Sequence, residues 1–305
     1  MSISAIIPCY NEEAFIGGAI ESLIHQSFPD LQIIVVDDGS TDETEKRVRE
    51  FGEAVTYVRQ KNQGVSTARN LGVSNANSEF FLFLDADDRI LPGALELLVS
   101  RMNARGESCG LVTGRIFYGE EIPEQKAVSG TDLEETQFSA QDFVLRNRIC
   151  SAVLVRRKAF ENVGGYDAEM THSEDRDLWA RIAVKWEVIE LNAKCFYFTN
   201  RPTSASKNAR KMKAGGRTFL AKAEESPDFQ HVSSLVWIQA RSVLDLQASG
   251  VYAEQGNFGR ALWELALSFL HCPVLPACAV PNSPSLVRLR RLVVLLIRAI
   301  SSRSE

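Results

Sequence analysis

The first 100 residues alternate between short apolar runs and longer segments with helical periodicity. Four apolar runs predict strands, at residues 3–7, 32–36, 55–58 and 80–84. Amphipathic segments between them predict helices, at residues 13–26, 42–51 and 66–76, and Pro92 stands where a further helix would begin. Elements that alternate in such short units form crossover connections. The pattern therefore predicts an α/β fold, with a mainly parallel sheet flanked by helices and ligands bound at the carboxyl ends of the strands.

The pattern becomes less regular after residue 110 and purely helical after residue 217. Strands are predicted at 111–117, 152–155 and within 187–198, with a helix at 175–184. The polar segment 119–141 is predicted to be a surface excursion, and the basic segment 200–216 a mobile loop. Three helices are predicted beyond it, at 232–246, 259–270 and 286–300. We expect two domains, residues 1–217 with the sheet and residues 218–305 as a helical C-terminal extension.

Composition and charge narrow the class of protein. The 305 residues are 45% hydrophobic and 24% charged, which is typical of a globular chain and excludes collagen-like and disordered classes. The net charge of −5 argues against nucleic acid as a partner, because general polyanion binders are basic overall. The six cysteines form no CxxC pair and the four histidines lie far apart, so we expect reduced, mostly buried thiols rather than disulfides or a zinc site.

Two features bear on localisation. Residues 2–8 are too short, and lack the basic residues, for a signal peptide. The longest run of large aliphatic residues, 293–297, is far below the roughly 18 residues of a membrane span. We therefore expect a soluble, cytoplasmic chain that contacts a membrane at most from its surface.

Polar side chains follow the first and second predicted strands. Tyr10 can stack on a base, and Asn11 and Glu12 can hold polar ligand groups, although helix capping explains these residues equally well. Asp37 and Asp38 end the second strand. Two adjacent carboxylates at a buried strand end cost desolvation unless something binds there, and a turn with an N-cap accounts for them poorly.

The third and fourth strands lead to a basic and an acidic group. Gly64 permits a positive φ before the third helix. Arg69 then lies in the first turn, where its charge is unfavourable unless an anion or a carboxylate lies opposite. Asp85 and Asp87, just past the fourth strand, are hard oxygen ligands suited to Mg²⁺ or Mn²⁺, which bind through one or two carboxylates plus ligand phosphates. Such a pair is common by chance, but polar strand ends at the same sheet edge favour a ligand site.

A further acidic pair, Glu174 and Asp175, stands at the start of the predicted helix 175–184. Because Leu178 and Ile182 form the buried stripe of this helix, the acidic pair faces outward. Acidic residues at this position also complement the helix dipole, and that structural role alone accounts for them.

Six motifs, taken together, resemble the family 2 glycosyltransferases of the GT-A fold over roughly residues 1–205. They are Pro8-Cys-Tyr-Asn-Glu, Val-Asp37-Asp38-Gly-Ser-Thr-Asp, Gly64 to Asn70, Asp85-Ala-Asp87-Asp88, Gly164-Gly-Tyr-Asp and Glu174-Asp175-Arg-Asp-Leu-Trp. Each motif is weak alone, but their order and spacing make the resemblance specific. The resemblance implies a GT-A catalytic domain over residues 1–217, and it does not cover the last 85 or so residues.

The resemblance also implies roles for individual residues. Those implied to bind the nucleotide are Pro8, Tyr10, Asn11, Glu12, Asp37, Asp38, Arg69 and Asp85. Asp38 would accept a hydrogen bond from the base, and Asp85 would contact the ribose or the sugar. Asp87 would hold the Mn²⁺ or Mg²⁺ ion that bridges the diphosphate. Asp175 would be the catalytic base, with Glu174 beside it.

The function implied by the resemblance is transfer of a sugar from a nucleotide-diphosphate sugar, UDP-linked, with inversion. The acceptor would be a hydroxyl of a saccharide or lipid-linked saccharide, in cell-envelope or extracellular polysaccharide biosynthesis. The chain shows neither the Gln-x-x-Arg-Trp motif nor the membrane helices of processive members, which favours a non-processive enzyme. One alternative is a non-catalytic nucleotide-sugar-binding or scaffolding protein, which the intact Asp85, Asp87 and Asp175 disfavour. Another is a nucleotidyltransferase, for which the acidic pair Glu174–Asp175 at a helix start is a poor fit.

The C-terminal part leaves two questions open. The basic segment 201–217 lies where family members carry a flexible lid over the nucleotide, and a disordered basic linker is the alternative. The final helix, 286–300, interleaves four arginines with aliphatic residues. A basic amphipathic helix of this kind can lie on an anionic membrane leaflet, here the inner face, or pack against protein.

Overall fold

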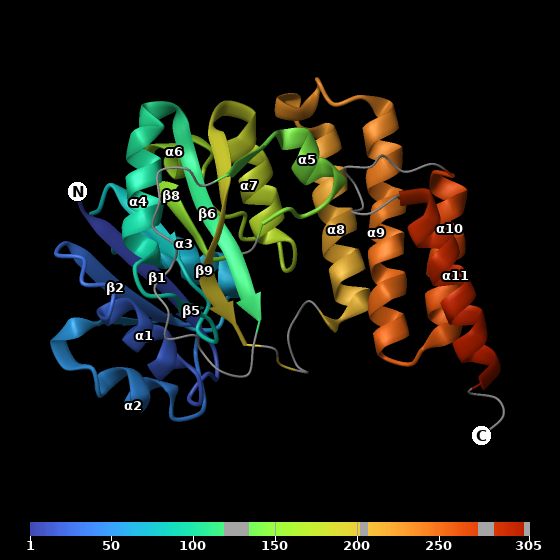
Figure 1. The fold of residues 1–305 in the computed structure, drawn as a ribbon. Coiled ribbons are helices and arrows are strands. Elements are labelled where there is room, and N and C mark those ends of the chain that lie inside the picture. The colour runs from blue at the N-terminus through green and yellow to red at the C-terminus, as the bar shows by residue number, and fades with distance from the viewer. Residues whose placement is uncertain (119–133, 150, 200, 202–206, 274–283, 302–305) are drawn as a thin grey trace. The chain divides into compact units, whose positions relative to one another are not determined.

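The computed structural model describes residues 1–118, 134–149, 151–199, 201, 207–273 and 284–301 (Figure 1). The chain forms two compact units. Unit 1 comprises Met1–Ser139, Ile149–Thr171 and Arg181–Asn200. Unit 2 comprises Ala140–Arg148, His172–Ala180 and Arg201–Glu305.

Within the described residues, unit 1 holds a nine-stranded sheet. Its strands are β1 (Ile3–Cys9), β2 (Leu31–Asp37), β3 (Thr56–Arg59), β4 (Phe80–Phe83), β5 (Arg89–Ile90), β6 (Cys109–Tyr118), β7 (Glu135–Phe138), β8 (Val153–Arg156) and β9 (Glu187–Phe198). The order is β3-β2-β1-β4-β8-β6-β9-β5, with β7 paired to β9. The pairs β1–β2, β1–β4 and β2–β3 are parallel, so this half is the parallel sheet expected from the sequence. Antiparallel β8 between β4 and β6 makes the whole sheet mixed.

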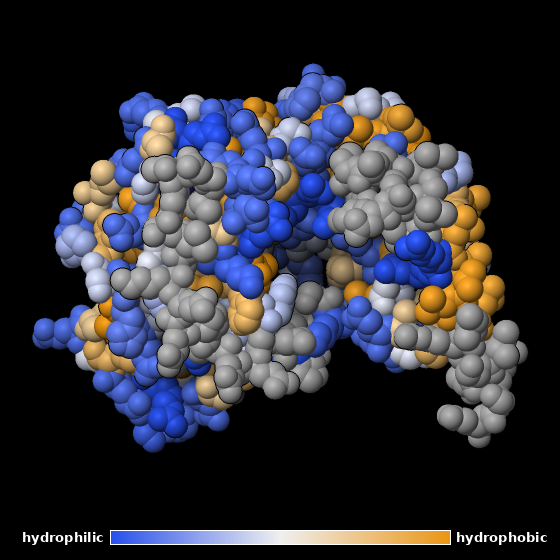
Figure 2. All heavy atoms as spheres, in the orientation of Figure 1, coloured by the Kyte–Doolittle hydropathy of each residue, from blue (hydrophilic) through white to orange (hydrophobic). Residues whose placement is uncertain are grey.

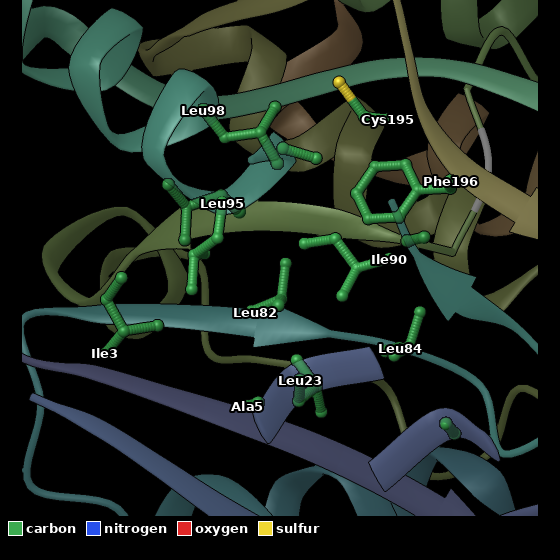
Figure 3. Close-up of a cluster of buried hydrophobic side chains, with 14 of the residues drawn as sticks. Ile3, Ala5, Leu23, Leu82, Leu84, Ile90, Leu95, Leu98, Cys195 and Phe196 are labelled. Atoms are coloured by element: carbon green, nitrogen blue, oxygen red, sulfur yellow. The ribbon is translucent and has the colours of Figure 1, made fainter. Parts of the chain in front are cut away.

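Helices cover both faces of this sheet. Those wholly within unit 1 are α1 (Ile16–Ile24), α2 (Thr44–Arg49), α3 (Val65–Ser74), α4 (Ala94–Ala104) and α6 (Arg157–Asn162), with short 3₁₀ turns at Gly52–Ala54 and Gly106–Ser108. On one face, α1 and α4 pack against alternate residues of β1 and β4. This core cluster includes Ile3, Ala5, Leu23, Leu82, Leu95 and Leu98 (Figure 3).

The opposite face is covered by α3 and α6. Phe81 of β4 meets the ring of Phe160 on α6 at a centroid distance of 5.6 Å. Gly72 of α3 lies so close to β1 that a Cβ atom there would come within 2.4 Å of Ile6 Cγ2. Because both faces are covered, the central strands are apolar throughout, which is why the sequence shows continuous apolar runs rather than alternation.

Helices make up most of unit 2. They are α5 (Ala140–Leu145), α8 (Ala209–Glu225), α9 (Ser234–Glu254), α10 (Phe258–His271) and α11 (Pro284–Ser301), with a 3₁₀ turn at Pro227–Phe229. The helices α8 to α11 run side by side (Figure 1). Helix α7 (Glu174–Lys185) crosses the division, since its residues up to Ala180 belong to unit 2 and those from Arg181 to unit 1.

The segment 200–216, expected to be a mobile loop because it has few apolar residues, is helical from residue 209 onward. Residues 209–216 form the first half of α8. Lys213 is buried there and pairs with Asp245 of α9, at 2.7 Å, and with Glu264 of α10. The cation is therefore satisfied inside the fold, not by solvent, and the domain boundary expected after residue 217 falls inside a helix. The last crossing between the two units lies at residues 200–201, and unit 2 also takes in Ala140–Arg148 and His172–Ala180. Residues 202–206 lie outside the described part.

The predicted surface excursion at 119–141 is also partly ordered. Residues Glu135–Phe138 form β7, which pairs antiparallel with β9, and α5 begins at Ala140. Glu135, acidic as the composition suggested, forms ion pairs with Arg101 at 3.3 Å and with Arg105. The remainder of the excursion, 119–133, lies outside the described residues.

The arginines of α11 are divided between its two sides. Arg288 is buried, and its guanidinium donates to the carbonyl oxygens of Cys272, at 2.6 Å, and Ser268, at 3.0 Å. Arg291 Nη1 donates to the carbonyl oxygen of Leu246 at 2.8 Å. Of the two interpretations of the basic helix, packing against protein therefore holds for these two side chains, which fasten α11 to α9 and α10.

The cysteines that the structure describes are buried, as expected from the sequence. Cys9, Cys109, Cys195 and Cys272 are buried free thiols; Cys150 and Cys278 lie outside the described residues. In the part of the chain that the structure describes, no helix combines the length and the apolar character needed to cross a bilayer.

Candidate functional site

The carboxyl ends of β1 and β2 are tied together by hydrogen bonds. The ladder continues past β2, where Asp38 N donates to Cys9 O at 2.9 Å. Asn11, in a left-handed conformation with φ of 56°, donates from its backbone N to Ser40 Oγ at 2.9 Å. Its side-chain Oδ1 accepts from Thr41 N at 2.8 Å. Asn11 thus shapes the loop rather than presenting its amide to a ligand.

Pro8 at the end of β1, and Tyr10 and Glu12 just after it, differ in whether their side chains are available to a ligand. Glu12 N donates to Thr44 Oγ1 at 2.9 Å, which continues the same connection between loops. Pro8 is buried in β1, in register with Val36, so it supports the strand end from within. Tyr10 is 47% exposed. Among these residues, Tyr10 is the side chain best placed to stack on a ligand.

Asp37 accepts three hydrogen bonds inside unit 1, and its side chain is completely buried. Its carboxylate accepts from Ser40 N at 2.7 Å, Tyr57 Oη at 2.6 Å and Arg59 Nη1 at 3.2 Å. Burial and the neighbouring Asp37 carboxylate raise the pKa of the Tyr57 phenol, which therefore stays protonated as a donor. The desolvation cost of this buried carboxylate is offset by protein donors, so its role is to hold the loop after β2.

Asp38 organises the segment that leads into α3. Its Oδ1 accepts from Gln60 Nε2 at 2.7 Å and from Gln63 N at 2.8 Å, and its Oδ2 accepts from Gly64 N at 2.8 Å. Gly64 has a φ of 91°, the conformation that the sequence anticipated for it. Each carboxylate oxygen can accept two hydrogen bonds, so Oδ2 keeps the capacity for one from a ligand.

An open hollow of about 540 Å³ adjoins Asp38. Its lining residues are Gly39, Arg59, Gln60, Lys61 and Asn62. Gln60 lines the hollow and also donates to Asp38, so one hydrogen bond connects the lining to this carboxylate. The hollow has the dimensions of a small-molecule site.

Arg69 of α3 has the carboxylate partner that its position requires. Its Nη2 donates to Asp85 Oδ1 at 2.8 Å, and its guanidinium lies 5.0 Å from the centroid of the Tyr166 ring. Ser151 Oγ donates to Asp85 Oδ2 at 2.7 Å. Asp85 is thus held from two sides while its side chain remains 32% exposed, which orients the carboxylate toward the sheet edge.

Asp87 lies in the turn after β4. Asp88 N donates to Asp85 O at 3.1 Å, which closes this turn, and Thr199 Oγ1 donates to Asp87 O at 2.5 Å. Asp85 and Asp87 are both half-buried. Within the described residues, no group of three or more His, Cys, Asp or Glu side chains could hold a metal ion by itself. Carboxylate oxygens such as those of Asp85 and Asp87 are the ligand type of a hard cation, which takes its remaining oxygen ligands from a bound phosphate or from water.

Glu174 and Asp175 begin α7 and belong to unit 2. Both are half-buried. The next residue, Arg176, is buried and donates to the carbonyl oxygens of Phe143 and Val144 of α5, at 2.7 Å each. Burial lowers the pKa of the Arg176 guanidinium to about 9. The two carbonyl oxygens and the Phe219 ring, whose centroid is 4.6 Å away, stabilise its positive charge. Arg176 fixes the first turn of α7, and the catalytic role of Asp175 stays a prediction.

Sequence reasoning missed several side chains that position this site. Gln60, Ser151 and Thr199 each bond to a predicted site residue across at least 22 positions of sequence. A lone Gln, Ser or Thr carries no motif, so only the folded contacts could have found them. The structure brings together Asp38 with Gln60 and Gly64, Arg69 with Asp85, and Asp87 with Thr199.

Solved structures that are similar to this chain define its fold type. TarS of S. aureus (residues 1–349, in complex with UDP-GlcNAc) matches with a TM-score of 0.61 at 17% identity, covering 89% of each chain. The mannosyltransferase PcManGT from Pyrobaculum calidifontis, in complex with GDP-Man and Mn²⁺, matches with a TM-score of 0.61 at 18% identity, covering 97% of this chain and 80% of that one. The fold is thus of the GT-A type, with a helical C-terminal region.

The sequence then gives the family. The profile described as "Glycosyl transferase family 2" matches residues 4–164, so this chain belongs to glycosyltransferase family 2. An uncharacterized glycosyltransferase of Rickettsia prowazekii is 29% identical over 185 residues, 58% of this chain and 57% of the relative. GalNAc(5)-diNAcBac-PP-undecaprenol beta-1,3-glucosyltransferase of Campylobacter jejuni is 35% identical over 149 residues, 47% of each chain. The chain spans about half the length of these curated relatives.

Proposed function

We propose that this chain transfers a single sugar from a UDP-linked donor to a hydroxyl of a saccharide or lipid-linked saccharide, with inversion. The observation that carries the proposal is the arrangement at one edge of the sheet, where Asp38 follows β2 and the Asp85–Asp87 turn follows β4. Strand β1 lies between the parallel strands β2 and β4, so these carboxylates follow strands that end at the same edge of the sheet. Ligands of open α/β sheets bind at this edge.

Each residue has a defined task in this proposal. Asp38, with Oδ2 still able to accept, receives the N–H of the base in the hollow lined by Gln60, while Tyr10 stacks on its face. Arg69 and Ser151 orient Asp85 toward the ribose or the sugar. Asp87 would hold Mn²⁺ or Mg²⁺, which when bound offsets the charge of the leaving diphosphate.

The proposed base is Asp175, which removes the proton of the acceptor hydroxyl as that oxygen attacks the anomeric carbon. Its place at the start of α7 favours the ionised form, because the helix N-terminus stabilises negative charge. Glu174 stands beside it as the second acidic group. We assign the catalytic domain to the GT-A part of the chain and the assembly of cell-envelope or extracellular polysaccharide as the process.

Names of relatives support the donor and acceptor classes. TarS has been solved with UDP and with UDP-GlcNAc. The Campylobacter jejuni relative is named for an undecaprenol-linked substrate. The minor teichoic acid biosynthesis protein GgaB of Bacillus subtilis is 28% identical over 185 residues, which are 57% of this chain and 20% of GgaB.

The test is a donor screen. Thermal shift is measured with UDP, GDP and a panel of their sugars, each with and without Mn²⁺, and release of nucleotide from the stabilising donor is followed. We expect Mn²⁺-dependent stabilisation by UDP-sugars and slow hydrolysis of one of them. Stabilisation without any turnover would make the chain a nucleotide-sugar-binding protein, and the absence of both would overturn the proposal.

A further inference from the structure

Helices α10 and α11 expose a large apolar surface. Six large apolar side chains on these helices are exposed: Trp263, Leu270, Leu289, Val293, Val294 and Leu296. Trp263 is 62% exposed and Leu270 78%. Figure 2 shows hydrophobic surface gathered along the side that α10 and α11 form. Exposed apolar surface that is contiguous, unlike scattered single residues, marks an interaction site.

The helical phase explains why these side chains face outward. On α11, Arg288, Arg291 and Leu295 recur at intervals of three and four and point into unit 2, where the two arginines bond backbone carbonyls. Leu289 and Val293 lie on the opposite stripe of the same helix. Two arginines of α11 are thus used inside the helical unit, together with Leu295, while four of its aliphatic side chains remain exposed.

Helix α10 also has one buried side and one exposed side. Ala261, Leu265 and Ser268 are buried against its neighbours, whereas Trp263 and Leu270 are exposed. We use the name α10–α11 face for the six exposed apolar side chains given above. A tryptophan at the edge of an aliphatic surface suits the boundary between water and hydrocarbon, because its indole ring is amphipathic.

Charge around the α10–α11 face is positive. The sequence of α11 contains no Asp or Glu, and the one acidic residue of α10, Glu264, is buried against Lys213. Arg260 is exposed three positions before Trp263, and Arg290 is exposed beside Leu289. A second copy of the chain would oppose these cations with like charges, whereas anionic headgroups would attract them.

We propose that the α10–α11 face docks on an anionic lipid bilayer, with its apolar side chains in the boundary between headgroups and acyl chains. Arg288 and Arg291 fasten α11 to the helical unit, and Arg260 and Arg290 meet the headgroups. This inference goes beyond the proposed function and does not depend on the donor. It would bring the enzyme to the surface where a lipid-linked acceptor lies.

The test uses the full chain and sedimentation with phosphatidylcholine vesicles, with or without phosphatidylglycerol. We expect binding to the anionic vesicles. The double variant Leu270→Ser/Val293→Ser should lower the partition coefficient at least about tenfold, because each side chain loses apolar area in the membrane. The matched control Ile24→Ser/Leu235→Ser, which changes exposed aliphatic residues elsewhere, should bind like the wild type. Equal binding by both double variants would overturn the proposal.

Tryptophan fluorescence gives a second, independent measurement. Of the four tryptophans, Trp179 and Trp237 are buried, Trp186 is half-buried and Trp263 is exposed, so a blue shift on adding anionic vesicles reports mainly on Trp263. We expect the shift in the wild type and its loss in Trp263→Phe. Arg290→Glu should weaken binding to anionic vesicles, whereas Arg47→Glu, an exposed arginine of α2, should not.

Two further measurements distinguish a lipid bilayer from a second copy of the chain as the partner of the α10–α11 face, and this inference from the proposed function. A concentration-dependent dimer in analytical ultracentrifugation that Leu270→Ser/Val293→Ser abolishes, without vesicle binding, would assign the face to a second copy and overturn the lipid proposal. UDP binding is measured on the same preparations. Vesicle binding without UDP binding would contradict the proposed function alone and leave this inference supported.

Discussion

Arg69 of α3 and Asp85 after β4 form an ion pair across 16 residues of sequence, with Nη2 and Oδ1 2.8 Å apart. Arg69 is only 2% exposed, whereas the Asp85 side chain is 32% exposed. The buried cation thus holds a carboxylate that still reaches solvent. Arg69 lies in the middle of the ten-residue helix α3, past its first turn, so its burial rather than the helix dipole requires an opposite charge. Asp85 supplies that charge and is oriented by the guanidinium.

We expect Asp87→Asn to remove the dependence of UDP binding on Mn²⁺. The amide keeps the size of the side chain but loses the charge that attracts a hard cation. UDP affinity in Mn²⁺, measured by isothermal titration, should fall at least about tenfold. Asp30→Asn is the control, since this exposed aspartate lies at the amino end of β2. Unchanged affinity in Asp87→Asn would move the metal to another residue.

Asp38→Asn should loosen the segment 60–64. The new amide nitrogen would face Gly64 N or Gln60 Nε2, so one partly buried donor loses its acceptor. Such a loss costs about 1–3 kcal/mol, which urea denaturation would measure. UDP affinity should fall in parallel, because the hollow beside Asp38 loses its shape. A variant with wild-type stability would show that other acceptors replace the carboxylate.

Asp175→Asn should abolish sugar transfer and leave donor binding nearly unchanged. Asparagine retains an oxygen that can accept hydrogen bonds at the helix start, but it cannot take a proton. Removing a general base costs on the order of 10² to 10⁴ in rate. Turnover and UDP-sugar affinity are compared for the wild type, Asp175→Asn and Glu174→Gln. If Asp175→Asn keeps more than about a tenth of wild-type turnover, Asp175 is a helix-stabilising residue and the base lies elsewhere.

Lys213→Met should destabilise the helical unit strongly. It leaves Asp245 and Glu264, both buried, without their cation. Breaking a buried ion pair by removing one partner costs about 3–5 kcal/mol. The control is Lys211→Met, which changes an exposed lysine of the same helix and should leave the unfolding free energy nearly unchanged. Equal unfolding free energies for the two variants would refute the structural role of Lys213.

Alkaline pH should weaken the fold through Cys109. Burial raises the pKa of this thiol from 9.0 to about 11, so the unfolded chain ionises it first. The stabilisation is present below pH 9 and is lost as pH rises toward 11, by up to roughly 2–3 kcal/mol. Urea denaturation from pH 8 to 10.5 should show a steeper decline for the wild type than for Cys109→Ala. Parallel curves would show that Cys109 does not contribute.

The sequence by itself determined the parallel half of the sheet and the residue types at its edge. Apolar runs such as 80–84 predict buried strands because a strand covered on both faces has no polar side to show. The crossover rule then places the ends of β2 and β4 at one edge. The expected conflict between Arg69 and its helix dipole likewise predicted a carboxylate opposite, and Asp85 fills that position, although the burial of Arg69 is what requires it.

Tertiary structure alone decided which polar residues are engaged within the fold. Asp37 and Asp38 look equivalent in sequence, and each accepts three hydrogen bonds inside the fold, but from different segments: Asp37 from Tyr57, Arg59 and Ser40, and Asp38 from residues 60–64. A carboxylate's hydrogen-bond partners come from distant segments, so no local pattern reveals them.

The same reason explains the basic segments. Lys213 and Arg288 resemble solvent-facing residues of a loop and of a membrane-binding helix, because sequence shows charge but not its partner. Inside the fold, Asp245 and Glu264 receive the first cation and backbone carbonyls the second. A buried charge is stable only when such partners surround it, and only the folded chain brings them within hydrogen-bond distance.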